Sequence, residues 1–576
     1  MKLNKWLATW LVLLWGWAGR EASAQPLDLV PEEADFVITV ARPKELVARG
    51  WDFVHSEFVR RLPGYEEALD QLTIRRLVQL VRYAERELGK PWRELVDELL
   101  GGGVVLAGKY GPVPSPVLLV IQGRNAPLMR QASELLADVL EQELARRDQP
   151  HQRKEHERSG LKVRQLGDMY WTLHGPALLV SNRLEVFDYV APLTHGRTER
   201  SFAQSGKWRS ARTIVPSEAL AWAWFDLRPP KTLKEVQQLL EVPGDLAIVH
   251  IFFGRYLDIF KRSDFLTAWL TANGVDFTVS VYAPAGWQGS GIGARTQVPE
   301  DGKAGLRPPL QVPGMVYSSS FYFDLGAFIK HRDKFLTEQQ RKGFEDFDRN
   351  SAKFLLGTRF SELASGLGPR HRLLVAQPDR KTYSVPTGIT LPSFALVLEL
   401  KDAERMGNKL ATLLRGAAFL ATFQTRMDLV EEEYHGVKLV GYRFVDNEAN
   451  RAIQNGLLFN FSPCFAQVGD QFLLGSSLEL GRQLVVRLQQ EQRQPRARDP
   501  ILFMDVVSWA GIADLLEQNK EQLVVQYMLE RVQTPESARQ QADEVIRWLR
   551  HLEHLQFQFT SEPKSSRLEI HMKLSR

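Results

Sequence analysis

The sequence predicts an α+β fold made of two tandem, diverged copies of one unit, with mostly antiparallel sheets and helices packed on one face. Similar segments recur in the same order in both halves, and such repeats are sought before a fold is assigned. Expected strands cluster in hairpins more often than they alternate with helices, which favours antiparallel pairing. The alternative arrangement is one continuous sheet shared by both copies.

The first copy is expected at residues 25–283. Its opening strand lies between Ala34 and Ala41, where apolar and β-branched residues dominate. Further on, the apolar run Leu118–Ile121 leads into an amphipathic helix at Ala126–Arg146. The other expected elements are helices at 53–62, 65–88 and 92–100, and strands at 104–107, 170–173, 177–181, 219–227 and 275–282.

The second copy is expected at residues 314–576, and the Gly- and Pro-rich residues 284–313 predict a surface linker before it. Its run Leu396–Glu399 leads into a helix at Asp402–Leu414 and repeats the pattern of the first copy. The other expected elements are helices at 336–356 and 360–364, a helix from 509, strands at 316–325, 373–376, 394–400, 465–468, 472–476 and 501–507, and a closing hairpin of 555–560 and 568–574.

The N-terminus has the pattern of a secretory signal peptide at residues 1–24. Lys2 and Lys5 precede an uncharged run, and the triplet Ala22-Ser23-Ala24 offers small residues for cleavage before Gln25. The alternative is an uncleaved N-terminal anchor. The pattern predicts export to the periplasm or the cell surface, with membrane contact only through an uncleaved signal.

Composition and charge exclude several classes of protein. Hydrophobic residues make up 44% of the 576 residues and charged residues 25%, as in globular proteins with large cores. The net charge is +4, of which the expected signal peptide carries +2, so the remaining chain also has +2. A balance so close to neutral does not predict a nucleic-acid partner.

The single cysteine, Cys464, cannot form an internal disulfide. An exported chain of this size can instead fold through burial of its core. Cys464 lies in the aromatic segment Phe459–Phe465, which predicts a small buried residue in a strand. The alternatives are a reactive thiol and an intermolecular disulfide.

One segment matches the phosphate-binding loop pattern only in part. Gly103–Lys109 has the spacing G-x-x-x-x-G-K, but Tyr110 follows in place of the Ser or Thr that binds magnesium. The residues between the glycines are apolar and predict a strand rather than a phosphate loop. We therefore expect no nucleotide site, and the sequence predicts no cofactor or metal.

Two polar residue types recur in corresponding places. Ser181 and Ser476 each follow an apolar strand and precede a helix, so Ser181-Asn182 and Ser476-Ser477 are the expected N-cap positions of these helices. Asp226 and Asp505 each lie near the end of a strand and predict caps or turn formers. No base recurs beside the serines and no second carboxylate beside the aspartates, so we assign no catalytic residue.

Aromatic residues are concentrated near the end of the first copy. They could line a groove for a sugar or a lipid, but large aromatic side chains are usually buried, so we expect them in the core. The residues are Trp222, Trp224, Phe225, Phe252, Phe253, Tyr256 and Phe260.

Several segments resemble an uncharacterised bacterial family of exported proteins that is defined only by a domain of unknown function. The segments are Leu29–Pro31 with the acidic pair that follows, Ala34–Val37, Leu179–Ser181 and Phe472–Ser476. The resemblance covers most of the expected mature chain and implies an envelope location and a repeated α/β fold. It implies no catalytic residues, and this chain lacks the lipid-attachment cysteine of some such proteins.

The sequence therefore predicts a non-enzymatic envelope protein that binds a protein or a polymer, such as a polysaccharide, between or on its two lobes. One alternative is a hydrolase whose site is assembled from residues distant in sequence. The other alternative is a structural scaffold without a small ligand.

Overall fold

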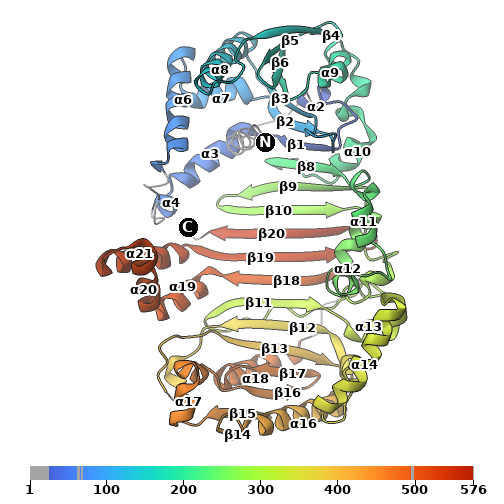
Figure 1. Cartoon of the computed structure of the whole chain (residues 1–576), viewed down its shortest axis with the longest axis vertical. Coiled ribbons are helices and arrows are strands. Elements are labelled where there is room, and N and C mark those ends of the chain that lie inside the picture. Colours follow the sequence, from blue (N-terminus) through green and yellow to red (C-terminus); the bar gives the residue numbers. More distant parts are fainter. Residues whose placement is uncertain (1–24, 61–64, 66–68, 384, 495–498, 575–576) are drawn as a thin grey trace. The chain divides into compact units, whose positions relative to one another are not determined.

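A computed structural model describes residues 25–60, 65, 69–383, 385–494 and 499–574. It divides into two compact units, which are treated separately (Figure 1). The first comprises the described residues up to Thr232 and Asp264–Val281, and the second comprises Leu233–Ser263 and the residues from Tyr282 onwards. Each contains helices and antiparallel strands, so the α+β fold is confirmed. The expected signal peptide lies outside the described residues.

The first unit contains an antiparallel sheet in which the first strand, β1, is central. Successive pairings give the order β4-β5-β6-β7-β3-β2-β1-β8-β9, and β10 pairs with β9. The strands are β1 (Phe36–Val40), β2 (Gly103–Gly108), β3 (Val117–Gln122), β4 (Lys154–Arg158), β5 (Leu161–Leu166), β6 (Met169–His174), β7 (Ala177–Ser181), β8 (Ala221–Asp226), β9 (Phe265–Asn273) and β10 (Asp276–Ala283).

The longest helix of the first unit, α8 (Ala126–Arg146), has the bounds that its sequence predicts. It begins there because the Asn125 side chain accepts a hydrogen bond from the Leu128 amide and Pro127 lies in the first turn. The other helices are α2 (Gln25–Asp28), α3 (Pro43–Val54), α4 (Glu57–Arg60), α6 (Leu72–Leu88), α7 (Trp92–Leu100), α9 (Val186–Thr194) and α10 (Gly206–Arg212), with short 3-10 turns at Thr198–Arg200, Phe202–Gln204 and Pro230–Thr232.

The second unit contains an antiparallel sheet with the order β14-β15-β16-β17-β13-β12-β11-β18-β19-β20. The strands are β11 (Met315–Tyr322), β12 (Leu367–Ala376), β13 (Ser393–Leu400), β14 (Met427–Tyr434), β15 (Val437–Phe444), β16 (Cys464–Val468), β17 (Gln471–Gly475), β18 (Ile501–Ser508), β19 (Leu552–Ser561) and β20 (Ser566–Leu574).

The helices of the second unit are more numerous and include α12, which precedes the linker in sequence. They are α11 (Lys234–Leu239), α12 (Ala247–Arg262), α13 (Leu325–Phe335), α14 (Glu338–Phe354), α15 (Phe360–Gly366), α16 (Ala403–Ala421), α17 (Glu448–Ala452), α18 (Leu478–Gln492), α19 (Trp509–Gln518), α20 (Lys520–Arg531) and α21 (Pro535–Leu549), with 3-10 turns at Ile292–Ala294, Arg380–Thr382 and Ile453–Asn460. None of the described helices combines the length and the apolar composition that crossing a membrane requires.

The two units have the same strand order. Each strand of the first unit corresponds to the strand of the second unit whose number is higher by ten. With this correspondence, the order across the first sheet, from β4 at one end to β9, is the same as the order from β14 to β19 in the second. Both sheets are therefore built around the first strand of the unit, which pairs with strands two and eight. Descent of the units from one duplicated ancestor stays a prediction.

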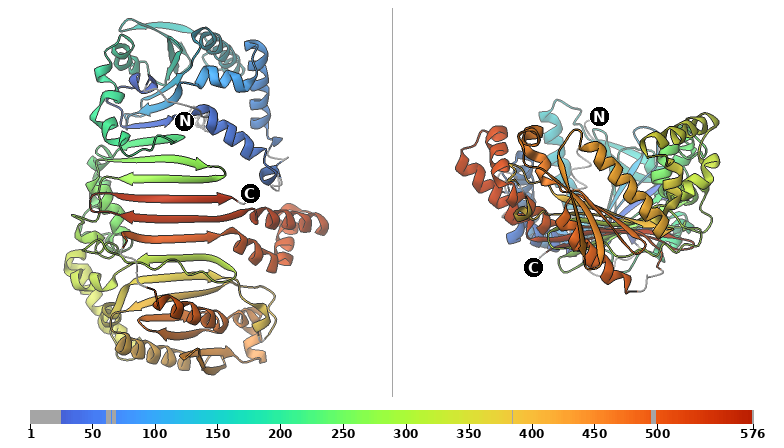
Figure 2. Two further views of the ribbon diagram at one scale, coloured as in Figure 1. Left: turned by 180° about the vertical axis from the view of Figure 1, so that it is seen from behind. Right: turned by 90° about the horizontal axis from the view of Figure 1, so that it is seen from below.

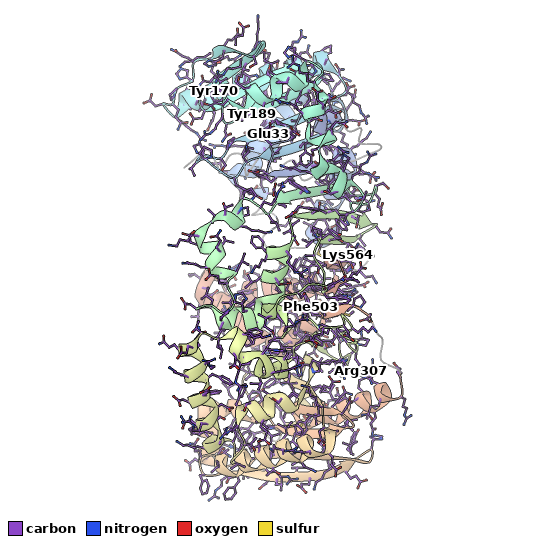
Figure 3. The ribbon with its side chains drawn as sticks, turned by 90° about the vertical axis from the view of Figure 1, so that its right-hand side faces the viewer. Glu33, Tyr170, Tyr189, Arg307, Phe503 and Lys564 are labelled. Carbon is purple, nitrogen blue, oxygen red and sulfur yellow. The ribbon has the colours of Figure 1, made fainter. Side chains whose placement is uncertain are left out.

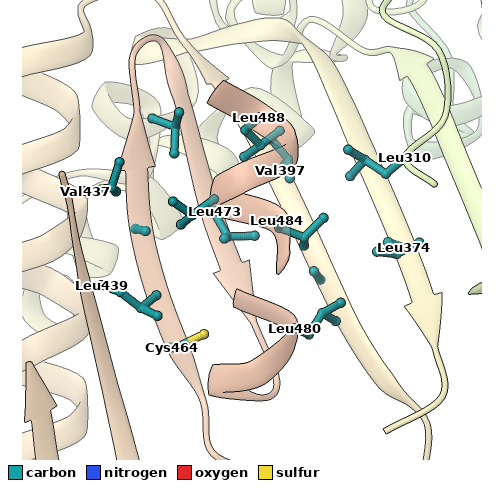
Figure 4. Close-up of a cluster of buried hydrophobic side chains, with 14 of the residues drawn as sticks. Leu310, Leu374, Val397, Val437, Leu439, Cys464, Leu473, Leu480, Leu484 and Leu488 are labelled. Carbon is teal, nitrogen blue, oxygen red and sulfur yellow. The ribbon is translucent and has the colours of Figure 1, made fainter. Parts of the chain in front are cut away.

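Helices contact both faces of the sheet in the second unit, so the expected packing on one face does not hold there. On one face, Leu484 and Leu488 of α18 pack with Val397 and Leu473 (Figure 4). On the other face, Met406 of α16 packs with side chains that include Leu400 and Phe472. The reason is that β13 carries apolar residues at both odd and even positions, which point to opposite faces.

The expected surface linker is irregular, but many of its side chains are buried. Gly and Pro predict a lack of regular structure, whereas the apolar side chains between them decide burial. The backbone is also held, because the Trp287 amide donates to the Glu562 carbonyl at 2.9 Å. The buried residues of the segment include Ala285, Ala294, Thr296, Val298, Ala304, Leu306 and Leu310.

Candidate binding surface

A small polar cavity lies inside the second unit. Its volume of about 20 Å³ is close to what one water molecule needs. It lies among β11, β12, β13, β17 and the irregular segment before β11, and its lining residues are Arg307, Ser320, Arg370, His371, Arg372, Val397, Glu399 and Gln471. A cavity of this size cannot admit a substrate.

The charged side chains around this cavity form ion pairs with groups of opposite charge. The Arg372 guanidinium donates to Glu491 at 2.6 Å, and both side chains are buried. Arg370 donates to Glu399 at 3.0 Å. Burial lowers the pKa of Arg372, and the charge of Glu491 opposes that shift. Because each buried charge has a partner, this cluster fits a structural role.

A second feature is one face of the strands β11, β18, β19 and β20. Residues paired across neighbouring strands, and residues two apart along a strand, lie on the same face of a sheet. Ten of the twelve residues on this face are apolar or aromatic. We call it the apolar sheet face, and it consists of Tyr317, Ser319, Phe321, Phe503, Asp505, Val507, Leu555, Phe557, Phe559, Leu568, Ile570 and Met572.

Most of the apolar sheet face is only partly buried. Apart from Ser319 and Phe559, each of its residues keeps some solvent exposure. Figures 1 and 2 show β18, β19 and β20 from both sides without a helix across their middle. The opposite face of β19 and β20 is polar, with Gln556, Gln558, Glu569, His571 and Lys573.

Helix α12 contributes a cation at one end of the apolar sheet face. The Arg255 guanidinium lies 4.8 Å from the ring centre of Phe503, labelled in Figure 3, and 5.1 Å from that of Phe559. The rings of Phe503 and Phe559 are nearly parallel, with centres 5.9 Å apart. Arg255 also donates to the Tyr256 hydroxyl at 2.9 Å. The arrangement places a guanidinium over aromatic rings, where cation–π attraction holds it.

Asp505 is the carboxylate of the apolar sheet face. It accepts a hydrogen bond from the Ser319 hydroxyl at 2.5 Å. Burial raises the pKa of Asp505, while hydrogen bonds from Ser319 and Tyr317 and the charge of Arg255 act in the opposite direction. It was expected to be a cap or turn former, which is wrong, since Ser508 caps the following helix by accepting from the Gly511 amide.

Asp226 fits the expected role better than Asp505 does. It ends β8, accepts from the Arg228 backbone amide at 3.0 Å and from the Arg228 guanidinium at 2.9 Å. Lys207 lies 3.7 Å away. Burial acts to raise the pKa of Asp226, but the hydrogen bonds from Arg228 and the charges of Arg228 and Lys207 together lower it. These contacts make Asp226 a turn former inside an ion-pair cluster.

Of the expected N-cap positions, Ser477 is confirmed, since its side chain accepts from the Leu480 amide at 3.3 Å at the start of α18. Ser181 and Ser476 themselves are not helix caps. Ser181 donates to the Val117 carbonyl at 2.7 Å, and α9 begins without a side-chain cap. Ser476 accepts from the Phe394 amide at 2.8 Å, which matches the way Asn182 accepts from the Val117 amide at 2.9 Å. The structural counterpart of Ser476 is therefore Asn182, one residue after Ser181.

Cys464 is buried in β16, as expected for a small residue of the core. Burial raises the pKa of its thiol to about 12. The thiol lies beside Gly475 of β17 and Gly481 of α18. A thiol with so high a pKa is neutral and unreactive.

The partial match to a phosphate-binding loop, Gly103–Lys109, lies in β2 and in the residue that follows it. Gly103–Gly108 is a fully buried strand that pairs with β1 and β3. Its amides are used in these pairings and cannot curl around a phosphate. Among the described residues there is also no group of three His, Cys, Asp or Glu side chains placed to hold a metal ion.

The aromatic residues expected in the core divide between the two units. Trp222 and Trp224 are buried in β8, which confirms the expectation for them. On α12, Phe252 and Phe253 are 55% and 57% exposed and Tyr256 is 38% exposed. That expectation is wrong for these three, because α12 presents them to solvent along one side.

The chain matches no family model, and no curated protein matches it. Among solved structures, crystal forms I and IV of TP0453 are similar to it at 11% sequence identity. Each alignment covers 46% of this chain and 81% of that chain, with a TM-score of 0.23. A likeness at this level carries no argument about function.

Proposed function

We propose that this chain is a non-enzymatic, exported envelope protein that binds a partner polypeptide on the apolar sheet face. The observation that carries the proposal is the contrast between the two faces of β19 and β20. One face is apolar and partly exposed, and the other is polar. Exposed apolar surface of this kind marks an interaction site in a stable protein.

The composition of the apolar sheet face favours a polypeptide over a carbohydrate polymer. Phe, Tyr and Met, with Arg at the edge, are enriched in protein interfaces, and charged residues are depleted at their centres. The face holds one carboxylate, Asp505, which is already hydrogen-bonded to Ser319. A carbohydrate would need many more hydrogen-bonding groups than this surface offers.

A hydrolase is less well supported. Asp505 has a raised pKa, as a general acid needs, but its neighbours are a hydroxyl, a phenol and a guanidinium. None of these described neighbours is a second carboxylate or a histidine. The polar cavity beside Arg372 also has room for only about one water molecule.

Site-specific photocrosslinking in the native cell envelope tests the proposal. A benzoylphenylalanine residue replaces Phe557 on the apolar sheet face, and Gln558 on the opposite face is the matched control. We expect a protein adduct from position 557 and none from 558. Introducing Ile570→Asp beside Phe557 should abolish that adduct, since Ile570 pairs with Phe557.

Three outcomes contradict the proposal. Equal crosslinking from both positions would show that the apolar face is not selective. An adduct of twice the chain mass would favour the scaffold alternative, in which copies of the chain associate. If a lipid or a glycan is attached and no protein is, the partner on this face is a lipid or a glycan and not a polypeptide.

A further inference from the structure

A separate apolar patch lies where α14 ends and where the second half of α16 runs. Phe354 is 84% exposed, Phe419 is 64% exposed and Phe423 is 75% exposed. Leu356 and Leu420 are more than half exposed as well. We call these five residues the α14–α16 patch. Figure 1 shows both helices in the second unit. Five large apolar side chains at this exposure exceed the scattered single residues of an ordinary surface.

Leu356, Phe419, Leu420 and Phe423 form one surface, and Phe354 lies two residues before Leu356 in the chain. A Cβ atom on Gly416 would lie 2.5 Å from the side chain of Leu356, so the end of α14 packs directly on α16. Gly416 is three and four residues before Phe419 and Leu420, which places them on the same side of the helix. The rings of Phe419 and Phe423 meet edge to face with centres 5.4 Å apart.

Leu356 has a strained backbone conformation. Its φ angle is 47°, in the left-handed region that leucine rarely adopts. Such strain persists where the surrounding structure imposes it. The packing of the Leu356 side chain beside Gly416 of α16 is part of that surrounding structure. The same conformation occurs at Val532 after α20, whose φ angle is 53°.

The apolar residues are accompanied by cations without acidic partners. Lys353, Arg359 and Arg426 form no ion pair with any carboxylate of the described residues. Other cations of the same two segments are neutralised, for example Arg349 by Asp346 at 3.4 Å and Arg415 by Glu431. Asp428, the acidic residue nearest to Arg426 in sequence, stands opposite Arg443 in the register of β14 and β15.

We propose that the α14–α16 patch docks on the surface of an anionic lipid bilayer. Exposed Phe and Leu flanked by Lys and Arg is the chemistry of interfacial binding: the apolar side chains enter the headgroup region while the cations attract anionic lipids. A second copy of the chain fits less well. A two-fold contact would bring the patch against itself and place the unpaired cations near one another. This contact does not depend on the N-terminal segment.

Vesicle flotation tests the proposal with the full chain. The vesicles contain phosphatidylcholine alone or phosphatidylcholine mixed with phosphatidylglycerol. We expect binding to the mixed vesicles that weakens as salt is added. The variant Phe354→Ser/Phe419→Ser/Phe423→Ser should lower the partition coefficient about a hundredfold, since each exposed ring contributes apolar area. Every variant keeps residues 1–24, so any binding by that segment is a constant background.

Two further variants separate the contributions. Lys353→Gln/Arg359→Gln/Arg426→Gln should weaken binding to the mixed vesicles about a hundredfold, at about fivefold per cation, and leave binding to phosphatidylcholine unchanged. The matched control is Val525→Ser/Leu529→Ser/Val532→Ser on and just after α20, where the side chains are 54%, 77% and 92% exposed. It should bind like the wild type.

Several results would overturn the proposal. These are no binding to mixed vesicles, equal binding to both kinds of vesicle, or equal losses in the patch and α20 variants. A concentration-dependent dimer that only the patch variant abolishes would assign the surface to self-association. Circular dichroism and thermal unfolding check that each variant folds. The photocrosslinking at Phe557 reports on a different surface, so the two proposals fail independently.

Discussion

Substitution of Gly481 tests how closely α18 packs on the sheet of the second unit. A Cβ atom at this position would lie 2.6 Å from the Cys464 Sγ atom and 3.3 Å from Leu439. The sulfur has little freedom to move, because it also contacts the Ser477 carbonyl at 3.3 Å. Real Cβ atoms do not approach a sulfur this closely, so Gly481→Ala must displace either the thiol or the helix.

Two effects of opposite sign decide the result. Replacing a helical glycine by alanine stabilises a helix by about 1 kcal/mol. Overpacking a well-filled core costs about 1–3 kcal/mol. Because the clash involves buried atoms of both a strand and a helix, we expect the second effect to win. The net loss should be about 1–2 kcal/mol in the free energy of unfolding.

The same substitution at Gly343 provides the matched control. Gly343 lies inside α14, and nothing is found within 4 Å of a Cβ atom placed there. Only the propensity effect remains, so Gly343→Ala should stabilise the protein by up to about 1 kcal/mol. Urea unfolding followed by circular dichroism measures both variants against the wild type.

A compensating change at Cys464 identifies the cause. In Gly481→Ala/Cys464→Ala, the new methyl group occupies space that the sulfur leaves, so the double variant should be more stable than Gly481→Ala alone. If Gly481→Ala stabilises the protein as Gly343→Ala does, or if Cys464→Ala brings no recovery, the close packing between α18 and β16 is refuted.

Four further predictions concern other sites. Arg372→Met should cost about 3 kcal/mol, because it leaves the buried Glu491 carboxylate with the more exposed Arg487, at 3.2 Å, as its ion-pair partner among the described residues. Arg372→Met/Glu491→Met should recover most of that loss, and equal losses in urea unfolding would count against the buried pair. The raised pKa of Asp505 means that the folded protein keeps a proton that the unfolded chain has released. Stability should therefore fall as pH rises from about 4 through the raised pKa, and Asp505→Asn should flatten this dependence in unfolding curves taken at several pH values. Cys464 should resist thiol reagents until the protein is denatured, and fast labelling of native protein would contradict its burial. Mass spectrometry of the protein recovered from cells should show an N-terminus at Gln25, whereas an intact leader would support the anchor.

Helices with clear end signals could be predicted from the sequence. The bounds of α7 and α8 agree with expectation, because Pro91 precedes α7 and Asn125 caps α8. Edge strands were harder to predict from the sequence than these helices. The strand β4 carries Lys154–Arg158, whose charges suggest loop or helix surface, yet it pairs with β5. Charged residues are common on edge strands because they prevent association through the free edge.

The sequence predicts the apolar residues of the apolar sheet face but not their exposure. Alternation of Leu555, Phe557 and Phe559 with glutamines predicts a strand with one apolar face. Whether a helix covers that face depends on the path of the chain elsewhere, which alternation does not encode. The burial of Arg372 was not foreseen for the same reason, since its partner Glu491 is 119 residues away.

The central position of β11 bears on how the second unit acquires its structure. Ser319 of β11 and its partner Asp505 of β18 are 186 residues apart in the chain. A nascent chain crossing a membrane in extended form would expose β11 long before β18 emerged, and high contact order of this kind slows folding. If the protein is exported as its N-terminus predicts, a chaperone on the far side would have to shield the unpaired edge of β11 during that delay.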